Sequence, residues 1–475
     1  MMLAIAASRV LAPFFGTSIT TWSILIGIIL GSLSLGYFSG EILANKETTV
    51  SKLVFIILFS SIYIGLVAFV NVYILRFIHL TISNIVFGTV ISTLIFFMPP
   101  IVLLGMVSPY IAKLQVNILN KASLTIEKLY ALSTLGSVLG IFLSVFALIP
   151  FMGTQKFIFL VSIILLITSC VMYFLNHFSK VLAVVSSILF LGLILGFVFN
   201  NSLGEKIADV DTRYNRVSIS DIQLKNTGQY VRQMLINDEN SSMMFLDSDD
   251  LVFGCMKFYD TMEHFNKNFH KTLMIGGAGY SYPKHYLSRY PNAVMDVIEI
   301  DEKVTDLARK YFNLHDNPRL SIYHQDGRTF LNNTNDKYDV ILGDAYSSKT
   351  PPFQLFTREA VQRMYDVLND NGLVILNVGS SIEGNTGKLL RAEYATYKTI
   401  FPQVYVFPIR YKDDGSKVQN IMLVAIKSRN VPSFTSNDQD LNSYLQHIWL
   451  KEIDADVQIF TDDYAPVEYY CMQLD

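Results

Sequence analysis

The sequence predicts an α-helical transmembrane bundle followed by an α/β, Rossmann-like domain with a small β unit at its start. Long apolar runs fill the first 200 residues, short strand-like segments alternate with helices from Lys271 onward, and a glycine-rich turn follows the first of those strands. We therefore divide the chain into three parts. They are residues 1–200, a helical domain of six to seven spans; residues 205–265, the β unit; and residues 266–475, the Rossmann-like domain.

Composition supports two kinds of domain. With 51% hydrophobic residues, 16% charged residues and a mean hydropathy of +0.36, the 475-residue chain is too apolar for an ordinary soluble enzyme. A net charge of -3 and a pI near 6.3 provide no basic surface for nucleic acid, so we expect no nucleic-acid partner. The three cysteines match no metal-binding spacing, and we expect no metal.

Six segments are long and apolar enough to cross a bilayer, which takes about 20 residues in a helix. Pro99 and Pro100 should kink or break the third of them, because proline lacks the amide donor that a helix needs. Small residues within the spans, namely Gly27, Gly31, Gly36, Gly136 and Gly140, suit close packing of helices. The predicted spans are Ile19 to Phe38, Leu53 to Leu75, Ile85 to Ile111, Leu129 to Pro150, Phe157 to Phe174 and Val181 to Phe199, and Met1 to Ala12 resembles the end of one more helix.

The role of the helical domain stays open between an anchor that packs against itself and a domain that binds or moves something. Asp, Glu, Lys and Arg are absent from the interior of every predicted span. The usual mark of a proton relay or ion pathway is therefore missing, which argues against an ion-coupled transporter.

The β unit and the main sheet can be located from their patterns. Arg216 to Ile222 and Tyr230 to Ile236 are strand-like and flank a turn at Asn226 to Gly228, which predicts a small antiparallel unit. Strands of the main sheet are expected at Leu273 to Ile275, Val294 to Ile300, Val340 to Leu342 and Leu373 to Val378, with one more strand before Asp326.

Residues with ligand-binding chemistry follow four of these strands. Gly276, Gly277 and Gly279 form a turn that lets a ligand approach the backbone at a helix N-terminus. Glu299 ends the second strand about 20 residues later, the spacing at which an acid meets a ribose hydroxyl pair. The pair Asp326 and Gly327 lies where an acid meets an adenine edge, and Asp344 ends the fourth strand. All four strand ends should face one crevice.

Simpler structural roles compete with these assignments. Glu299 can cap the following helix, and Asp344 can form a turn. Asp301 is better explained as a helix-start residue than as a ligand, and Tyr280 and Tyr282 suit packing as well as they suit substrate contact.

From Tyr214 to Thr357 the chain resembles the spermidine synthase, or polyamine aminopropyltransferase, family. As a whole it resembles bacterial membrane proteins in which a multi-span domain is fused to a spermidine-synthase-like domain. This wider resemblance also covers Ala7 to Gly16, Gly105 to Pro109, Thr134 to Gly136 and Thr461 to Glu468.

The resemblance implies a fold of the S-adenosylmethionine-dependent methyltransferase type, with S-adenosylmethionine or its decarboxylated form as co-substrate and an amine or polyamine as acceptor. It implies an aminopropyltransferase-like enzyme that releases methylthioadenosine, and a homo-oligomer, since soluble relatives commonly associate. The residues implied are Gly276, Gly277, Gly279, Glu299, Asp326 and Gly327 for the co-substrate and Asp344 for catalysis on the attacking amine. Beside Asp344, the hydroxyls of Tyr346 and Ser347 can help to accept or steer the amine proton, so we expect Tyr346 to be catalytic. We expect Tyr214, Asn215, Tyr280 and Ser347 on the acceptor side.

Several positions depart from the family pattern. Gly279 stands where the family has an Asp that pairs with the amine of the decarboxylated donor, and Tyr346 to Lys349 lacks the family's second acid. Tyr214 and Asn215 replace a Tyr-Gln pair. A polyamine carries several positive charges and needs several carboxylates to balance them. The absence of an acid at Gly279 leaves room for the carboxylate of intact S-adenosylmethionine. A lyase, a methyltransferase, and a transporter or sensor with a nucleotide-binding domain therefore remain as alternatives.

Two arguments about membrane orientation disagree. The distribution of lysines between the short loops would place the soluble domain outside by the positive-inside rule. Nucleotide-like cofactors are made and kept in the cytosol. We expect a multi-pass protein of a bacterial-type cell membrane whose soluble domain is cytoplasmic.

Overall fold

The computed structural model describes residues 1–16, 18–46, 48–82, 84–119, 122–175, 192, 206–225, 227–248, 250–346 and 350–474. The chain forms two compact units. The first comprises Met1–Glu205 with Val210–Arg216, and the second comprises Lys206–Asp209 with Val217–Asp475. Each unit is described by itself below.

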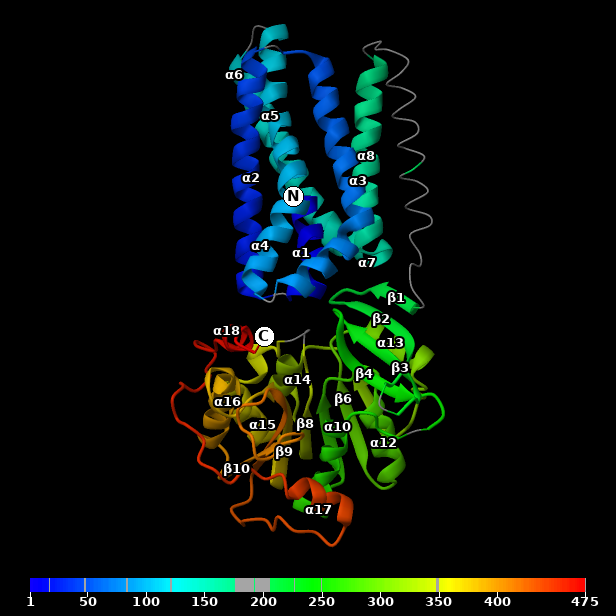
Figure 1. Ribbon diagram of the computed structural model, residues 1–475, viewed down its shortest axis with the longest axis vertical. Coiled ribbons are helices and arrows are strands. Elements are labelled where there is room, and N and C mark those ends of the chain that lie inside the picture. The colour runs from blue at the N-terminus through cyan, green and yellow to red at the C-terminus, as the bar shows by residue number, and fades with distance from the viewer. Residues whose placement is uncertain are drawn as a thin grey trace. The chain divides into compact units, whose positions relative to one another are not determined.

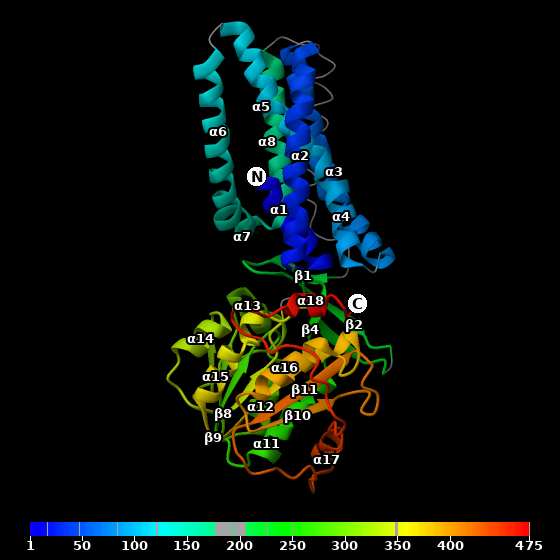
Figure 2. The ribbon, with the colours of Figure 1, turned by 90° about the vertical axis from the view of Figure 1, so that its left-hand side faces the viewer.

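The first unit consists of apolar helices, and its long helices α2, α3, α5 and α8 run alongside one another (Figures 1 and 2). Four stretches of helix in the described residues are long and apolar enough to cross a membrane, or five if one bent pair is a single span. The predicted span Val181 to Phe199 lies outside the described residues. The elements are α1 (Met2–Phe15), α2 (Ile19–Lys46), α3 (Val50–Thr81), α4 (Ile85–Phe96), α5 (Met98–Leu119), α6 (Ala122–Leu143), a π-helical turn (Ser144–Leu148), α7 (Ile149–Met152) and α8 (Thr154–Leu175).

The break predicted at Pro99 and Pro100 is confirmed. Helices α4 and α5 meet at Phe97 with a bend of 49°, and both prolines lie in the first turn of α5, where a missing amide donor costs least. Sharp bends in long helices commonly have this cause.

The glycines of α2 differ in their surroundings. A Cβ at Gly36 would overlap the carbonyl oxygen of Val102 and lie 2.9 Å from the Cα of Gly105, so α2 and α5 pack backbone to backbone there. Gly27, Gly31 and Gly136 differ from Gly36, because no atom of the described residues lies within 4 Å of a Cβ position at any of them.

The second unit begins with a four-stranded sheet in the order β1-β2-β3-β4. Its strands are β1 (Lys206–Asp211), β2 (Arg216–Gln223), β3 (Tyr230–Ile236) and β4 (Glu239–Phe245), of which β1 straddles the division between the units. The pairs β2-β3 and β3-β4 are antiparallel. The predicted antiparallel unit is therefore present, with strands at Arg216–Gln223 and Tyr230–Ile236 where they were expected.

The main sheet has seven strands in the order β10-β11-β9-β8-β5-β6-β7. The five strands from β9 to β7 are parallel, and β11 and β10 join antiparallel at the β9 edge. The chain leaves β5 toward β6 on one side and returns to β8 on the other, and ligands bind at such a reversal of strand order in doubly wound sheets. The strands are β5 (Lys271–Ile275), β6 (Val294–Ile298), β7 (Leu320–Tyr323), β8 (Tyr338–Gly343), β9 (Leu368–Ser380), β10 (Gln403–Pro408) and β11 (Gln419–Ile426).

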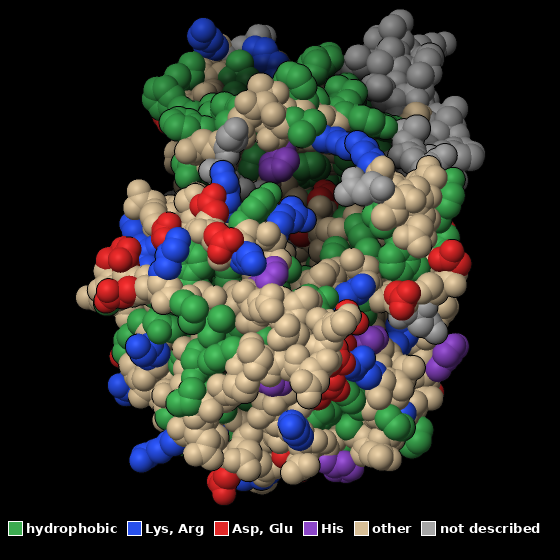
Figure 3. Space-filling model, turned by 60° about the horizontal axis from the view of Figure 1, so that its bottom comes forward, with side chains coloured by type: hydrophobic (Ala, Val, Ile, Leu, Met, Phe, Trp, Pro, Cys, Tyr) green, Lys and Arg blue, Asp and Glu red, His purple; other side chains and the backbone are tan. Residues whose placement is uncertain are grey.

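This topology is the predicted Rossmann-like fold of the S-adenosylmethionine-dependent methyltransferase type. The central strands are buried on both faces, as parallel strands between layers of helices must be. On the lower face of this unit, Lys and Arg side chains are interspersed with Asp and Glu (Figure 3). The helices are α10 (Gly254–Phe258), α11 (Met262–Phe265), α12 (Ser281–Arg289), α13 (Glu302–Tyr311), α14 (Gly327–Asn333), α15 (Arg358–Val367), α16 (Lys388–Lys398), α17 (Gln439–Leu445) and α18 (Val467–Cys471), with short 3-10 turns at Tyr259–Thr261, Phe353–Leu355 and Asn385–Gly387.

Candidate active site

The glycine loop connects β5 to α12 and touches the loop that follows β8. Gly276 has a φ of 103°, and a Cβ there would overlap the carbonyl oxygen of Asp344. The amide of Asp344 in turn donates to the carbonyl of Ile275 at 2.9 Å. Only glycine combines this backbone conformation with this close approach. The two loops with the strongest predicted chemistry are thus joined at the carboxyl edge of the sheet.

The other two glycines of the loop make room for protein side chains. A Cβ at Gly277 would lie 2.6 Å from the ring of Tyr280, and one at Gly279 would lie 2.5 Å from Oγ of Ser242. Ala278 and Tyr280 have positive φ values of 44° and 54°. Non-glycine residues adopt this conformation at an energetic cost, and such positions cluster at ligand clamps.

Glu299 follows β6, and its carboxylate is hydrogen-bonded to the backbone of the glycine loop. Its Oε2 accepts hydrogen bonds from the amides of Gly277 at 3.0 Å and Ala278 at 3.1 Å, and its Oε1 accepts from the amide of Asp301 at 3.0 Å. Burial raises the pKa of the Glu299 carboxyl, and the three amide bonds oppose that rise. Asp301 rather than Glu299 caps α13, since its side chain accepts from the amide of Lys303.

Asp326 and Gly327 form the corner between β7 and α14. Asp326 is the N-cap of α14, and its Oδ1 accepts from the amide of Thr329 at 2.9 Å. A Cβ at Gly327 would meet Cγ2 of Ile275 at 2.9 Å, so this corner packs directly on the end of β5. It therefore lies at the same sheet edge as the glycine loop.

Asp344 is partly buried and is held by two polar neighbours that sequence reasoning missed. Its Oδ1 accepts from Nδ2 of Asn377 at 3.1 Å, and the hydroxyl of Tyr259 lies beside it and donates to the carbonyl of Gly343 at 3.3 Å. Burial raises the pKa of Asp344 to about 6, and the polar groups of Asn377 and Tyr259 limit the rise. A carboxyl group with such a pKa is ionised at neutral pH and basic enough to accept a proton.

Tyr346 is fixed two residues beyond Asp344. Its hydroxyl donates to the carbonyl of Asn377 at 2.9 Å and accepts from the amide of Gly379 at 3.0 Å. Burial is the main reason that its pKa is well above the ordinary value. The hydroxyl is thus a neutral group tied to the end of β9, the strand that also carries Asn377.

Four residues were predicted on the acceptor side, and Tyr280 is the one that the described part of the second unit contains. Tyr280 is fully buried, and its hydroxyl bonds Oγ1 of Thr305 at 2.8 Å, which gives it a packing role. Tyr214 and Asn215 lie between β1 and β2 in the stretch that belongs to the first unit. Ser347 lies outside the described residues.

Asn377 carried a weak signal in the sequence. It is an amide within the apolar run Leu373 to Val378, and a buried polar residue in a central strand needs a partner. Tyr259 carried none, because it reaches the site only through the tertiary fold. Cys255 also lies near Asp344, and burial raises the pKa of its thiol to about 12, which keeps it protonated.

Comparison with known proteins identifies the family of this domain. A model of the spermine/spermidine synthase domain matches residues 258–427. A polyamine aminopropyltransferase of Vibrio vulnificus is 30% identical over 217 residues, which cover 42% of this chain and 70% of that protein. The chain belongs to the spermine/spermidine synthase family. A probable polyamine aminopropyl transferase of Bifidobacterium longum is also 30% identical, over 220 residues that cover 42% of this chain.

The residues that the family model matches lie in the second unit. The chain spans 49% of the length of the Bifidobacterium relative. Among solved structures, a probable spermidine synthase from Corynebacterium glutamicum aligns with 56% of this chain and 98% of its own, at 18% identity and a TM-score of 0.45. In the described part of the chain, no group of three or more His, Cys, Asp or Glu side chains is placed to hold a metal ion.

Proposed function

We propose that this protein is a membrane-bound aminopropyltransferase-type enzyme that moves a propyl-type group from S-adenosylmethionine or its decarboxylated form to an amine and releases methylthioadenosine. The observation that carries the proposal is the junction of Gly276 with Asp344. It joins a ligand-binding loop to an acid of tuned pKa in the segment that matches the family.

The residues around this junction suit an adenosyl donor. Glu299 offers the ribose a buried carboxylate that amide bonds already orient. Asp326 and Gly327 would border the adenine, and the glycine loop would accept the methionine-derived end beside Asp344. Pre-oriented groups of this kind lower the entropic cost of binding.

The chemistry requires alignment more than acid-base work, because a sulfonium is already a good leaving group. The amine nitrogen forms a bond to the propyl carbon next to sulfur. The carbon-sulfur bond breaks, and its electron pair stays on sulfur as methylthioadenosine. The proton that the amine loses passes to the carboxylate of Asp344. Asn377 and Tyr259 would orient that carboxylate, and Tyr346 would line its approach.

The long apolar helices of the first unit support a membrane location. In the described part of the chain, four helical stretches of at least 22 residues each contain an 18-residue window with a mean hydropathy of 1.8 to 2.7, which suits a hydrocarbon core. We propose a bilayer anchor with the enzymatic unit in the cytoplasm, where adenosyl donors are made.

One observation favours a second candidate, a lyase that breaks the sulfonium internally without an acceptor. The loop offers no acid to the donor's amine, and Ser242 fills the space beside Gly279 where such a side chain would stand. An enzyme that does not hold the donor amine by charge is less specialised for the decarboxylated donor.

Chromatography of the adenosine product separates these functions. The purified full-length protein would be incubated with S-adenosylmethionine or its decarboxylated form, with and without polyamines. Amine-dependent methylthioadenosine supports the transferase, and methylthioadenosine without amine supports the lyase. S-adenosylhomocysteine indicates a methyltransferase, and the absence of any product points to a sensor.

A further inference from the structure

The segment Phe460–Tyr464, called here the C-terminal strap, contacts the adenine corner of the candidate site. Oδ2 of Asp462 pairs with Nη2 of Arg328 at 2.9 Å. Its Oδ1 accepts from Oγ1 of Thr357 at 2.6 Å, and its amide donates to Oε2 of Glu359 at 3.0 Å. The strap overlaps the motif Thr461 to Glu468, which has no other part in the proposed chemistry.

Arg328 connects the strap to both sides of the site. It directly follows Gly327 in the first turn of α14, and its Nη1 donates to the carbonyl of Gln354 at 3.2 Å and to Thr357 at 3.0 Å. Gln354 and Thr357 lie on the segment that continues from the loop after Asp344. The guanidinium of Arg328 therefore links the corner at Gly327 to the segment that follows Asp344.

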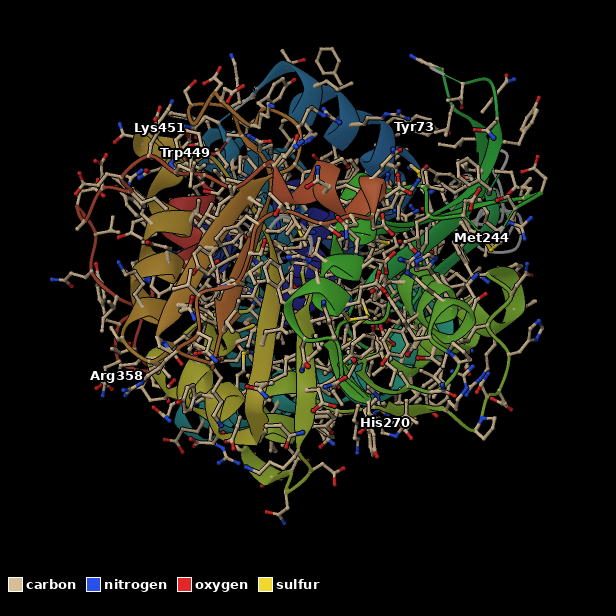
Figure 4. All side chains as sticks on the ribbon, turned by 90° about the horizontal axis from the view of Figure 1, so that it is seen from below. Tyr73, Met244, His270, Arg358, Trp449 and Lys451 are labelled. Atoms are coloured by element: carbon tan, nitrogen blue, oxygen red, sulfur yellow. The ribbon has the colours of Figure 1, made fainter. Side chains whose placement is uncertain are left out.

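The strap is anchored by buried contacts next to Asp462. Phe460 is fully buried, its amide donates to Oγ1 of Thr396 at 2.9 Å, and its carbonyl accepts from the amide of Arg358 at 2.9 Å. The side chain of Arg358 lies at the periphery of the second unit (Figure 4). The backbone of the strap is thus fixed independently of the Asp462 carboxylate.

An isolated surface ion pair contributes little, but Asp462 is one member of a network. Its two oxygens bind two different partners, and Arg328 and Thr357 also bind each other. Arg328 is largely buried, with 16% of its side chain exposed, which favours a fixed geometry.

We propose that Asp462 is a positioning residue that holds Arg328 and thereby sets the adenine wall of the donor pocket in register with the loop that carries Asp344. The inference rests on the proposed function, because it assumes that an adenosyl group occupies this corner. It adds that the C-terminal strap determines how tightly that group binds.

The test compares Asp462→Asn with Asp463→Asn in the full-length protein. Asp463 is the adjacent acid on the same strap, it is exposed, and its carboxylate has no hydrogen-bond partner among the described residues. Calorimetry with methylthioadenosine as probe should show about tenfold weaker binding for Asp462→Asn, the scale of one hydrogen bond to a charged group, and unchanged binding for Asp463→Asn. In Asp462→Asn the KM for the donor should also rise, while the KM for the amine should stay unchanged.

A merely structural role predicts a different pattern, in which the melting temperature falls and both KM values change together. Arg328→Gln and the double variant complete a cycle, and the two losses should be strongly non-additive if the residues act through each other. If Asp462→Asn does not fold, Arg328→Gln alone tests the same link. Wild-type affinity in Asp462→Asn, or additive losses, would overturn the inference. A wild-type protein that binds no probe would instead overturn the proposed function.

Discussion

Replacing Asp344 with Asn removes the proposed proton acceptor while its size and its bond to Asn377 are largely kept. If Asp344 takes the amine proton, turnover should fall about 100-fold or more, the usual scale for a positioned general base. This loss corresponds to about 2.7 kcal/mol in the activation barrier. Affinity for the adenosyl donor should stay within a few-fold, because Glu299, Asp326 and the glycine loop are unaltered.

The pH dependence gives a second measure of the same group. With a pKa of about 6, the Asp344 carboxylate is present above that pH, so kcat/KM should fall tenfold per pH unit below it. Asn377→Ala removes a hydrogen bond that lowers this pKa, so the midpoint should move upward. A bond to a charged group contributes about 1.5 to 3 kcal/mol, equivalent to about one to two pH units. Asn369→Ala is the control, because Asn369 lies on the same strand and donates to Oδ1 of Asp339 instead of Asp344.

Single-turnover rates across pH and donor calorimetry would be measured on the same preparations. Normal turnover in Asp344→Asn would remove this residue from the mechanism. A midpoint that does not move in Asn377→Ala would refute the proposed tuning. Donor affinity and turnover that fall together, with no effect of added amine, would indicate the lyase.

Three further predictions concern other parts of the molecule. Glu299→Gln should weaken adenosyl binding by roughly 10- to 150-fold in calorimetry, because an amide cannot accept both the loop amides and the ribose hydroxyls as a carboxylate can; unchanged affinity would contradict the ribose role. Burial raises the pKa of the Glu393 carboxyl well above 4.5, and neither of its oxygens has a hydrogen-bond partner among the described residues. Its protonated form therefore favours folding at low pH, and that contribution is lost as the pH rises. Glu393→Met should therefore raise the free energy of unfolding by about 1 to 3 kcal/mol at pH 8 and by less at pH 5. An equal gain in melting temperature at the two pH values would contradict this prediction. In detergent, Gly36→Ala should lower the melting temperature, by overpacking worth about 1 to 3 kcal/mol, while Gly31→Ala should not; equal effects would contradict the close α2-α5 contact.

Local patterns were sufficient to predict much of the fold. Within the described residues, apolar run length located the long helices, and the two prolines located the break between α4 and α5. Alternation of strand and helix located β5, β6, β8 and β9, because strands buried on both faces are short and apolar. The antiparallel strands β10 and β11 were not predicted, since nothing local indicates on which edge a returning chain will pair.

The site depended more on contacts between distant residues. Gly276 and Asp344 were selected because each follows a strand, but their direct contact came only from the structure. Asn377 reaches Asp344 across 33 residues, and Asp462 reaches Arg328 across 134. Pairings at such separations have no periodic signature in a single sequence. For Tyr280 the sequence left packing and substrate contact open, and the structure shows a left-handed backbone at this residue and a ring that is buried in the core.

The most direct test of the central claim is a product assay on the intact protein in detergent or lipid. The decarboxylated donor and S-adenosylmethionine would be supplied separately, with a panel of polyamines or none, and the adenosine products would be separated by chromatography. The account predicts methylthioadenosine that accumulates only when both donor and amine are present and that falls about 100-fold in Asp344→Asn. An absence of methylthioadenosine under every condition, in protein that is folded, would contradict it.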